Sequence, residues 1–185
     1  FVPAFKSPQD FASHSPFALP SPPSLASFQA ILTGRVNFGD AIITTLLMVV
    51  VMVVGQLVSS VLAAYAFARI EFPGREVIFW LFLGTMMIPA SVLVIPLYLM
   101  MAKMGLNNTF WGIVLPFVFA SPYAVFLLRQ SFRQIPQEII DAATMDGAGQ
   151  MRILFSIVVP VSKPIISTLV LITVVSQWNS FMWPR

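Results

Sequence analysis

Four long apolar runs dominate the chain after residue 40, and short polar segments separate them. They cover residues 41–68, 77–101, 110–132 and 165–183. A membrane-spanning helix needs about 20 mostly apolar residues, which each run supplies or approaches. None of the runs alternates strictly between apolar and polar residues, so the pattern predicts helices rather than strands. We therefore expect an all-α, polytopic transmembrane helical bundle with four spans in this chain.

Composition indicates that the surroundings of these helices are lipid. Hydrophobic residues make up 58% of the chain and charged residues 9%, whereas ordinary soluble domains contain about 25% charged residues. Because the bilayer core holds no water, so apolar a chain must satisfy its backbone within helices or a closed barrel. The chain has no cysteine, which excludes disulfides and cysteine-bound metals. Its net charge of +3 comes from scattered basic residues, which favours a topology signal over nucleic-acid binding.

Prolines interrupt two of the predicted spans. The second and third runs contain two each, at Pro89, Pro96, Pro116 and Pro122. A proline inside a helix removes a backbone donor and bends the helix. A membrane tolerates such a break where protein or a water-filled cavity receives the freed carbonyl groups. These prolines mark either packing kinks or a moving gate, and the sequence leaves both interpretations open.

Small residues recur along the first run, at Gly55, Ser59, Ala63 and Ala64. Small side chains allow another helix to approach a span closely. Gln56 is the one strongly polar residue in the interior of this run. The pattern therefore favours tight packing against a neighbouring span.

Residues 1–40 differ from the rest of the chain. They contain six prolines and many serines, and they lack the basic start and apolar centre of a signal peptide. This composition is typical of a disordered tail. The alternative is an ordered extracytoplasmic loop held by Phe28, Ile31 and Leu32. We interpret residues 1–40 as an extracytoplasmic loop or tail and residues 41–185 as the transmembrane domain.

A polar loop, residues 133–163, separates the third and fourth runs. Pro136 sets φ for a first helical turn, and Glu138 places a negative charge where that helix has free N–H groups. Asp146 and Gly147 form a helix stop, because glycine tolerates the left-handed conformation of a C-terminal cap. The loop therefore has the pattern of a helix followed by a tight turn.

Two helical segments are expected in this loop. The first covers about 137–146, and the second, more apolar segment covers 151–159 and ends at Pro160. An amphipathic helix held outside the membrane by two spans suits docking to a soluble partner. Gly147 either adopts a positive φ or permits close packing, and both explanations stay open.

Basic residues gather on one side of the predicted bundle. That side carries Arg69, Arg75, Arg129, Arg133, Arg152 and Lys163, and the opposite short turn has only Lys103. The positive-inside rule places the basic side in the cytoplasm. The loop 133–163 is then cytoplasmic, and the N-terminal segment is outside.

The chain lacks the motifs of common enzymes. It has no GxxxxGK[ST] phosphate loop and no GxSxG nucleophile elbow. His14 is the only histidine, which makes a histidine metal site or a catalytic triad implausible. Charges on an exposed helix are far more often a solvated or docking face than a catalytic pair. We therefore expect no enzymatic activity, no bound cofactor and no metal site in this chain.

Polar residues also gather near the far end of the fourth run, at Ser176, Gln177 and Asn179. Such groups are costly to expose to lipid, so they face protein or water. One interpretation is an interhelical hydrogen bond. The other is that Gln177 and Asn179, with Ser121 and Tyr123 of the third run, line a solute pathway, since amides and hydroxyls suit a hydroxyl-rich solute.

The loop and several other segments resemble a known family. The stretch DAATMDGA (141–148), followed by Ile157, Pro160 and Pro164, resembles the EAA motif of the membrane subunits of ABC importers. Asp141 stands where that family usually has Glu, and Leu154 stands where Phe is common. Further segments resemble its carbohydrate-importing branch, the maltose-permease G-type subunits. They are AAYAFARIEFPGRE (63–76), the proline-containing run 88–98, GLNNT (105–109), FLLRQSFRQIP (126–136) and QWNSFMWP (177–184).

The resemblance, over residues 28–184, implies a fold, a role and partners. The fold is the type I (MetI-like) permease, which usually has six spans, so the first and last would be missing here. The loop would be a coupling helix inserted into a groove of an ATPase subunit. The coupling residues implied are Glu138, Asp141, Ala142, Ala143, Asp146, Gly147 and Ala148. The partners implied are a second permease, an ATPase dimer carrying ATP and Mg, and an extracytoplasmic solute-binding protein.

The function implied is uptake of a sugar or sugar-like solute across a bacterial or archaeal cell (inner) membrane. A secondary transporter or channel subunit, not driven by ATP, is the alternative. Such proteins often carry ionisable residues inside their spans for coupling. The predicted spans have essentially none away from their ends, which argues against proton or sodium coupling.

Overall fold

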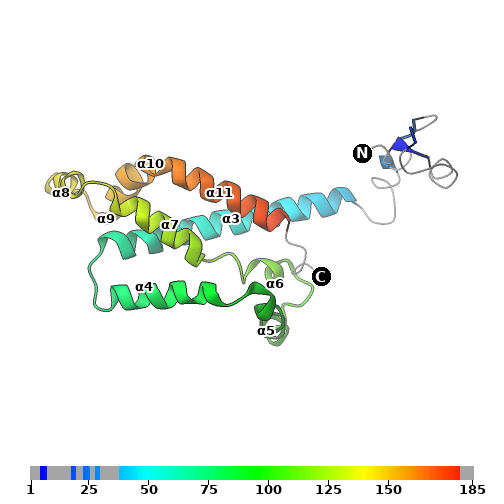
Figure 1. Cartoon of the computed structure of the whole chain (residues 1–185), viewed down its shortest axis with the longest axis horizontal. Helices are drawn as coiled ribbons and strands as arrows, with labels where there is room; N and C mark the ends of the chain where they lie inside the picture. Colours follow the sequence, from blue (N-terminus) through cyan, green and yellow to red (C-terminus); the bar gives the residue numbers. More distant parts are fainter. Residues whose placement is uncertain (1–4, 8–17, 20–22, 26–27, 30–37, 180–185) are drawn as a thin grey trace. The chain divides into compact units, whose positions relative to one another are not determined.

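The computed structural model describes residues 5–7, 18–19, 23–25, 28–29 and 38–179. The chain divides into two compact units, Phe1–Leu47 and Met48–Arg185. Every secondary-structure element in the described ranges is a helix, which confirms the predicted all-α class (Figure 1). Most of the predicted N-terminal segment 1–40, and the end of the fourth span beyond Asn179, lie outside the described residues.

The first predicted span is one long helix. α3, Phe38–Arg69, has 32 residues, and its part from Gly39 to Arg69 is long and apolar enough to cross a membrane. Asp40 lies in its first turn and Arg69 in its last turn, where each charge opposes the helix dipole. The span predicted over 41–68 is confirmed.

The second predicted span, 77–101, is sharply bent. Its first part is α4 (Arg75–Gly84), which continues into the 3-10 turn η2 (Thr85–Met87). The second part, α5 (Ala90–Lys103), is bent away from the first by 100°. Pro89 lies at this break with a φ of −58° and a ψ of 133°, and it directly precedes α5. Pro96 lies inside α5. Of the two prolines, Pro89 therefore marks the boundary between two helices.

The third predicted span, 110–132, is broken into two helices. α6 (Phe110–Val114) is short, and α7 (Pro122–Arg133) begins only at the second proline. Prolines lack the N–H group, and helical backbone is disfavoured for the residue before a proline. Ser121 is accordingly extended, with a φ of −85° and a ψ of 133°.

Helix length and hydropathy alone do not identify the broken third run as a span. Among the described residues, one helix is long and apolar enough to cross a membrane alone, and two bent pairs pass the same test together. Counting each bent pair as one span gives three, against the four predicted. The apolar run 110–132 has the composition of a span, but its two prolines prevent a helix of that length.

The fourth predicted span continues a bent helix. α11 (Lys163–Trp178) follows α9 (Gln150–Ile153), the π-helical η3 (Leu154–Val158) and α10 (Val159–Val161) at an angle of 80°. The prediction that Pro160 ends the segment 151–159 is wrong, because the helix runs through it to Val161. The π turn lies directly before Pro160, where the α-helical bond from the proline nitrogen is missing.

The buried core of the second unit lies where α3, α4, α7 and the helices after the loop meet. Its fully buried apolar side chains include Ala64, Phe79, Val125, Leu128, Phe132, Ile153, Leu154 and Val158. Within this unit, α4 runs back along α3, and α8 lies at the same end as the connection between them (Figure 1). The turn 69–76 and the loop 133–163 therefore share one end, as the basic residues predict.

Gly55 lies where the irregular segment between α6 and α7 crosses α3. A Cβ atom at this position would lie 2.3 Å from Val118 Cγ2 and 2.8 Å from the Val118 carbonyl oxygen. Nearby, the N–H of Ser121 donates to Ser60 Oγ at 3.3 Å. The predicted close approach is thus confirmed at Gly55, although the neighbour is an irregular segment rather than a helix.

Gly55→Ala should destabilise the protein by about 1–3 kcal/mol, because the added methyl group overpacks the contact with the Val118 backbone. Gly84→Ala is the matched control, since a Cβ atom there would meet nothing within 4 Å and alanine favours a helix. Thermal unfolding of both variants in detergent measures the difference. Equal melting temperatures would contradict a tight contact at Gly55.

Candidate functional site

The helix and turn predicted between the third and fourth runs are present. α8 spans Gln137–Met145, within one residue of the predicted 137–146. Pro136 precedes it as the N-cap residue. Glu138 lies in its first turn, where a negative charge stabilises the helix end. The local signals of proline and acid therefore locate the start of this helix correctly.

A Schellman motif closes α8. The N–H of Gly147 donates to the carbonyl of Thr144 at 2.9 Å, and the N–H of Ala148 donates to that of Ala143 at 3.0 Å. Gly147 has a φ of +79°, which confirms the positive φ. A Cβ atom there would meet nothing within 4 Å. Close packing is therefore not the reason for this glycine.

One face of α8 packs on the core, and the other is exposed. Ile140 is buried, and Ala143 and Ala148 contact the core from partly buried positions. The exposed residues include Glu138, Ile139, Asp141, Ala142, Met145, Asp146 and Gly147. Within the described ranges, no group of three or more acidic or histidine side chains could hold a metal ion. The exposed face combines carboxylates with apolar side chains, and Met145 is 88% exposed.

Both ends of the α8 segment are hydrogen-bonded to the last turn of α3. Arg69 Nη1 donates to Gln137 Oε1, at the start of α8, at 2.7 Å. The Tyr65 hydroxyl donates to Gln150 Oε1, at the start of α9, at 2.6 Å. From the sequence, Arg69 was interpreted only as a topology marker, and nothing linked Arg69 or Tyr65 to the two glutamines. No local pattern could link them, because Tyr65 and Gln150 are 85 positions apart.

Arg69 also binds the end of α7. Its Nη2 donates to the carbonyls of Phe132 and Ile135, each at 2.5 Å. Carbonyl groups at this end of a helix lack α-helical donors. One guanidinium group therefore joins the last turn of α7 to the first residue of α8.

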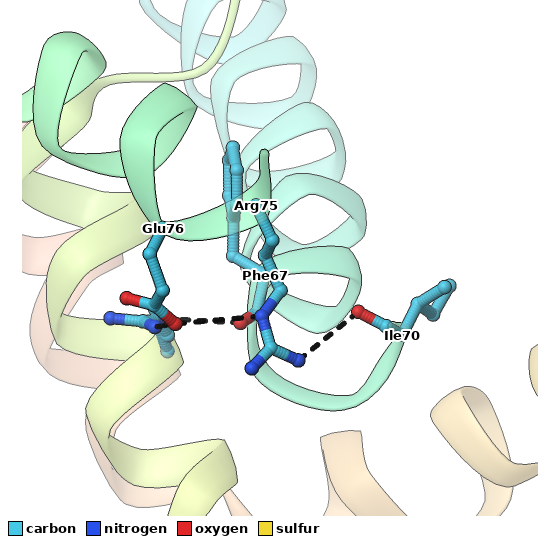
Figure 2. Close-up of polar contacts among 5 residues, drawn as sticks. Phe67, Ile70, Arg75 and Glu76 are labelled. Atoms are coloured by element: carbon cyan, nitrogen blue, oxygen red, sulfur yellow. Dashed lines mark hydrogen bonds and ion pairs between the residues drawn. The ribbon is translucent and has the colours of Figure 1, made fainter. Parts of the chain in front are cut away.

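A buried arginine joins α3, α4 and α7. Arg129 of α7 is 4% exposed, and its Nη2 pairs with Glu76 Oε1 at 2.5 Å. Its Nε donates to the carbonyl of Phe67 at 3.1 Å, and its Cζ lies 3.9 Å from the centre of the Phe79 ring. Figure 2 shows Glu76 beside Arg75, which also pairs with it at 3.4 Å. Sequence analysis treated Arg129 only as a basic residue at the end of a span.

The predicted pathway residues lie in two pairs. Ser121 is the N-cap residue of α7, and Tyr123 in its first turn is 40% exposed. Gln177 lies in the last turn of α11, and Asn179 follows that helix. Asn179 Nδ2 donates to the carbonyl of Val175 in its own helix at 2.9 Å. Asn179 thus has a local partner on the preceding turn of α11.

A small cleft between α3, α7 and α11 contains other polar groups. Its lining residues are Val53, Gln56, Leu57, Ala124, Leu169, Val170 and Thr173. None of the four predicted pathway residues belongs to this lining. Gln56 was recognised as the polar residue of the first run, but no signal in the sequence paired it with Thr173.

Apolar helices of spanning length, with an exposed helix and turn at one end, are typical of a membrane protein. Sequence comparison identifies the family more closely. The chain belongs to the family "Binding-protein-dependent transport system inner membrane component", which matches residues 56–185. The chain is therefore a member of a family of inner membrane components of transport systems.

Several known proteins are similar to this chain. The sn-glycerol-3-phosphate transport system permease protein UgpE of Yersinia pestis is 38% identical over 147 residues, which cover 80% of this chain and 52% of that protein. The diacetylchitobiose uptake system permease protein NgcG of Streptomyces coelicolor is 31% identical over 182 residues, covering 98% and 60%. The chain thus spans about half the length of these relatives.

A solved structure is also similar. It is the crystal structure of a bacterial ABC transporter involved in the import of the acidic polysaccharide alginate. One of its chains matches with a TM-score of 0.87 and 28% sequence identity, covering 99% of this chain and 64% of that chain. The predicted permease fold class is confirmed by this likeness together with the family match.

Arg129→Lys should lower thermal stability. Lysine can keep the ion pair with Glu76, but it lacks the planar group that lies on Phe79 and the Nε donor for Phe67. We expect a loss of about 1–3 kcal/mol. Arg133→Lys is the control, because Arg133 is exposed. Melting curves of the two purified variants measure the effect, and matching curves would contradict a structural role for Arg129.

Proposed function

We propose that this chain is part of the permease subunit of an ABC importer that takes up a sugar or sugar-like solute. The observation that carries the proposal is α8, an exposed helix closed at Gly147 and attached to the end of apolar helices in a chain of this transport family. A helix in this position can pass the movement of a soluble partner to the spans. We place ATP hydrolysis on a separate subunit.

The partners proposed are those that such an importer needs. A second, similar permease completes the pathway, and two ATPase subunits bind ATP and Mg. A solute-binding protein delivers the solute from outside. The exposed apolar side chains of Ile139 and Met145, with the carboxylates around them, are the surface that we assign to the ATPase groove. The loop 133–163 is then cytoplasmic, in agreement with the positive-inside rule.

The proposed mechanism is mechanical. ATP binding closes the ATPase dimer and draws the two coupling helices together. Each helix moves the spans to which it is attached, and the pathway changes from inward-facing to outward-facing as packed helices rotate together. The binding protein then releases its solute into the pathway. The residues of α8 take no part in chemistry, because their role is to bind the ATPase and transmit its movement.

The solute class rests on the relatives. Their names mention sn-glycerol-3-phosphate, diacetylchitobiose and alginate, which all carry hydroxyl groups. We propose that Ser121, Tyr123, Gln177 and Asn179 line the pathway, because amides and hydroxyls can both donate to and accept from hydroxyl groups.

Reconstitution of the whole importer in vesicles tests the proposal. We expect uptake that requires both enclosed ATP and the binding protein, and a thermal-shift screen of the binding protein identifies the solute. Uptake that needs no ATP and follows a proton or sodium gradient would instead support the secondary transporter.

Gly147→Val should uncouple uptake from ATP hydrolysis while the protein still inserts and assembles. The φ of +79° is costly for a β-branched residue, on the order of 1 kcal/mol or more, so the turn after α8 changes direction. Uptake and ATPase activity, measured in the same vesicles, give the coupling ratio. Gly147→Asn is the control, since asparagine tolerates this conformation better. Full coupled uptake by Gly147→Val would contradict the proposed role of the turn.

Gln177→Ala and Asn179→Ala should each reduce uptake and leave assembly and basal ATPase activity unchanged. The reason is that a pathway residue contacts the solute, whereas a packing residue supports the whole complex. Uptake rates over a range of solute concentrations are the measurement, with the yield and melting temperature of the complex as controls. Wild-type uptake by both variants would remove these residues from the pathway.

A further inference from the structure

The last turn of α3 holds the α8 segment at two points. Tyr65 and Arg69 lie four residues apart, which places them on one face of the helix. Their partners, Gln137 and Gln150, lie at the two ends of the segment that contains α8 and its closing turn. Both ends of this segment are therefore bonded to a single turn of a single helix.

Arg69 makes the more extensive of the two attachments. Its bonds to the carbonyls of Phe132 and Ile135 hold the end of α7, and its bond to Gln137 holds the start of α8. A guanidinium group is planar and rigid, so these bonds set a direction as well as a distance. Gln137 Nε2 also donates to Asp141 Oδ1 at 2.9 Å, which extends the chain of bonds by one turn along α8.

Apolar packing alone leaves the direction of α8 weakly defined. Ile140 is its one buried residue, and Ala143 and Ala148 contribute small side chains. Small apolar contacts are not directional, whereas hydrogen bonds are. The bonds from α3 are therefore the contacts that can determine where the exposed face of α8 points.

We infer that Arg69 is a positioning residue that sets the direction of α8 relative to α3, with the Tyr65–Gln150 bond as the second anchor. The consequence of this attachment for transport rests on the proposed function, in which α8 binds the ATPase. α3 then receives the movement of α8 directly through these bonds. The effect of Arg69 on the mobility of α8 is measurable without any partner protein.

A spin label on α8 tests the inference directly. The chain has no cysteine, so Met145→Cys provides a single labelling site on the exposed tip of the helix. Gln137→Leu removes the α8 end of the attachment, while Arg69 keeps its two carbonyl partners and the fold is preserved. We expect the label to become about twofold more mobile in the electron paramagnetic resonance spectrum, as for a segment that has lost a local restraint.

Gln134→Leu is the matched control, because it makes the same change at an exposed position just before the loop helix. Arg69→Lys should give intermediate mobility, since lysine keeps the charge but not the fork of donors. Equal mobility in Gln137→Leu and Gln134→Leu would overturn the inference, whatever the transport result.

The assembled importer gives a second measurement. Tyr65→Phe, which removes the second anchor from α3 without changing α8, should lower the stimulation of ATPase activity by the solute-loaded binding protein several-fold, with basal activity and complex yield unchanged. A purely structural role would instead lower yield and basal activity together, and that result would contradict the inference. If the unmodified importer shows no ATP-dependent uptake, the proposed function fails, and the label mobility still decides the role of Arg69.

Discussion

Backbone groups at a helix break have no water to bind inside a membrane, and in this protein side chains supply their partners. Arg69 donates to the carbonyl of Phe132 in the last turn of α7 and to that of Ile135, which follows the helix. Thr109 Oγ1 accepts from the N–H of Gly112 at the start of α6, and Ser60 Oγ accepts from the N–H of Ser121 just before α7. The breaks around α6 and α7 can therefore persist in apolar surroundings, and the bent arrangement of the chain depends on these few polar contacts.

The same contacts explain which features could be predicted from the sequence. α8 and its turn depend on neighbouring residues, so Pro136 and Gly147 were sufficient to predict them. The first span follows from length and hydropathy alone. Hydropathy does not depend on backbone donors, so it indicates one span over the run 110–132. The helix boundary inside this run is indicated instead by Pro122 and by the backbone restriction that it places on Ser121. The partners of Arg129 and Tyr65 lie far away in the sequence, and no local pattern reveals them.

The loop combines two kinds of surface that serve different purposes. Ile140 and the small alanines attach α8 to the core, and the polar bonds from α3 orient it. The face with Ile139, Met145 and the carboxylates is left exposed. The resemblance to a known family predicted the exposed residues that a soluble partner would contact. The contacts that attach the helix to the spans became visible only in the folded structure. A transport permease needs both, since binding without a rigid attachment would transmit no movement.

The π-helical turn Leu154–Val158 has a consequence for the helix that follows it. One additional residue within a turn shifts the phase of all later side chains by about 100°. Ser162 is buried, and its Oγ lies 3.4 Å from Ser131 Oγ on α7, so this meeting depends on the shifted phase. The three residues of α10, Val159–Val161, carry this shift as far as Ser162, where the chain bends by 80° into α11. The extra residue in the π-helical turn therefore helps to set the side of α10 from which α11 departs.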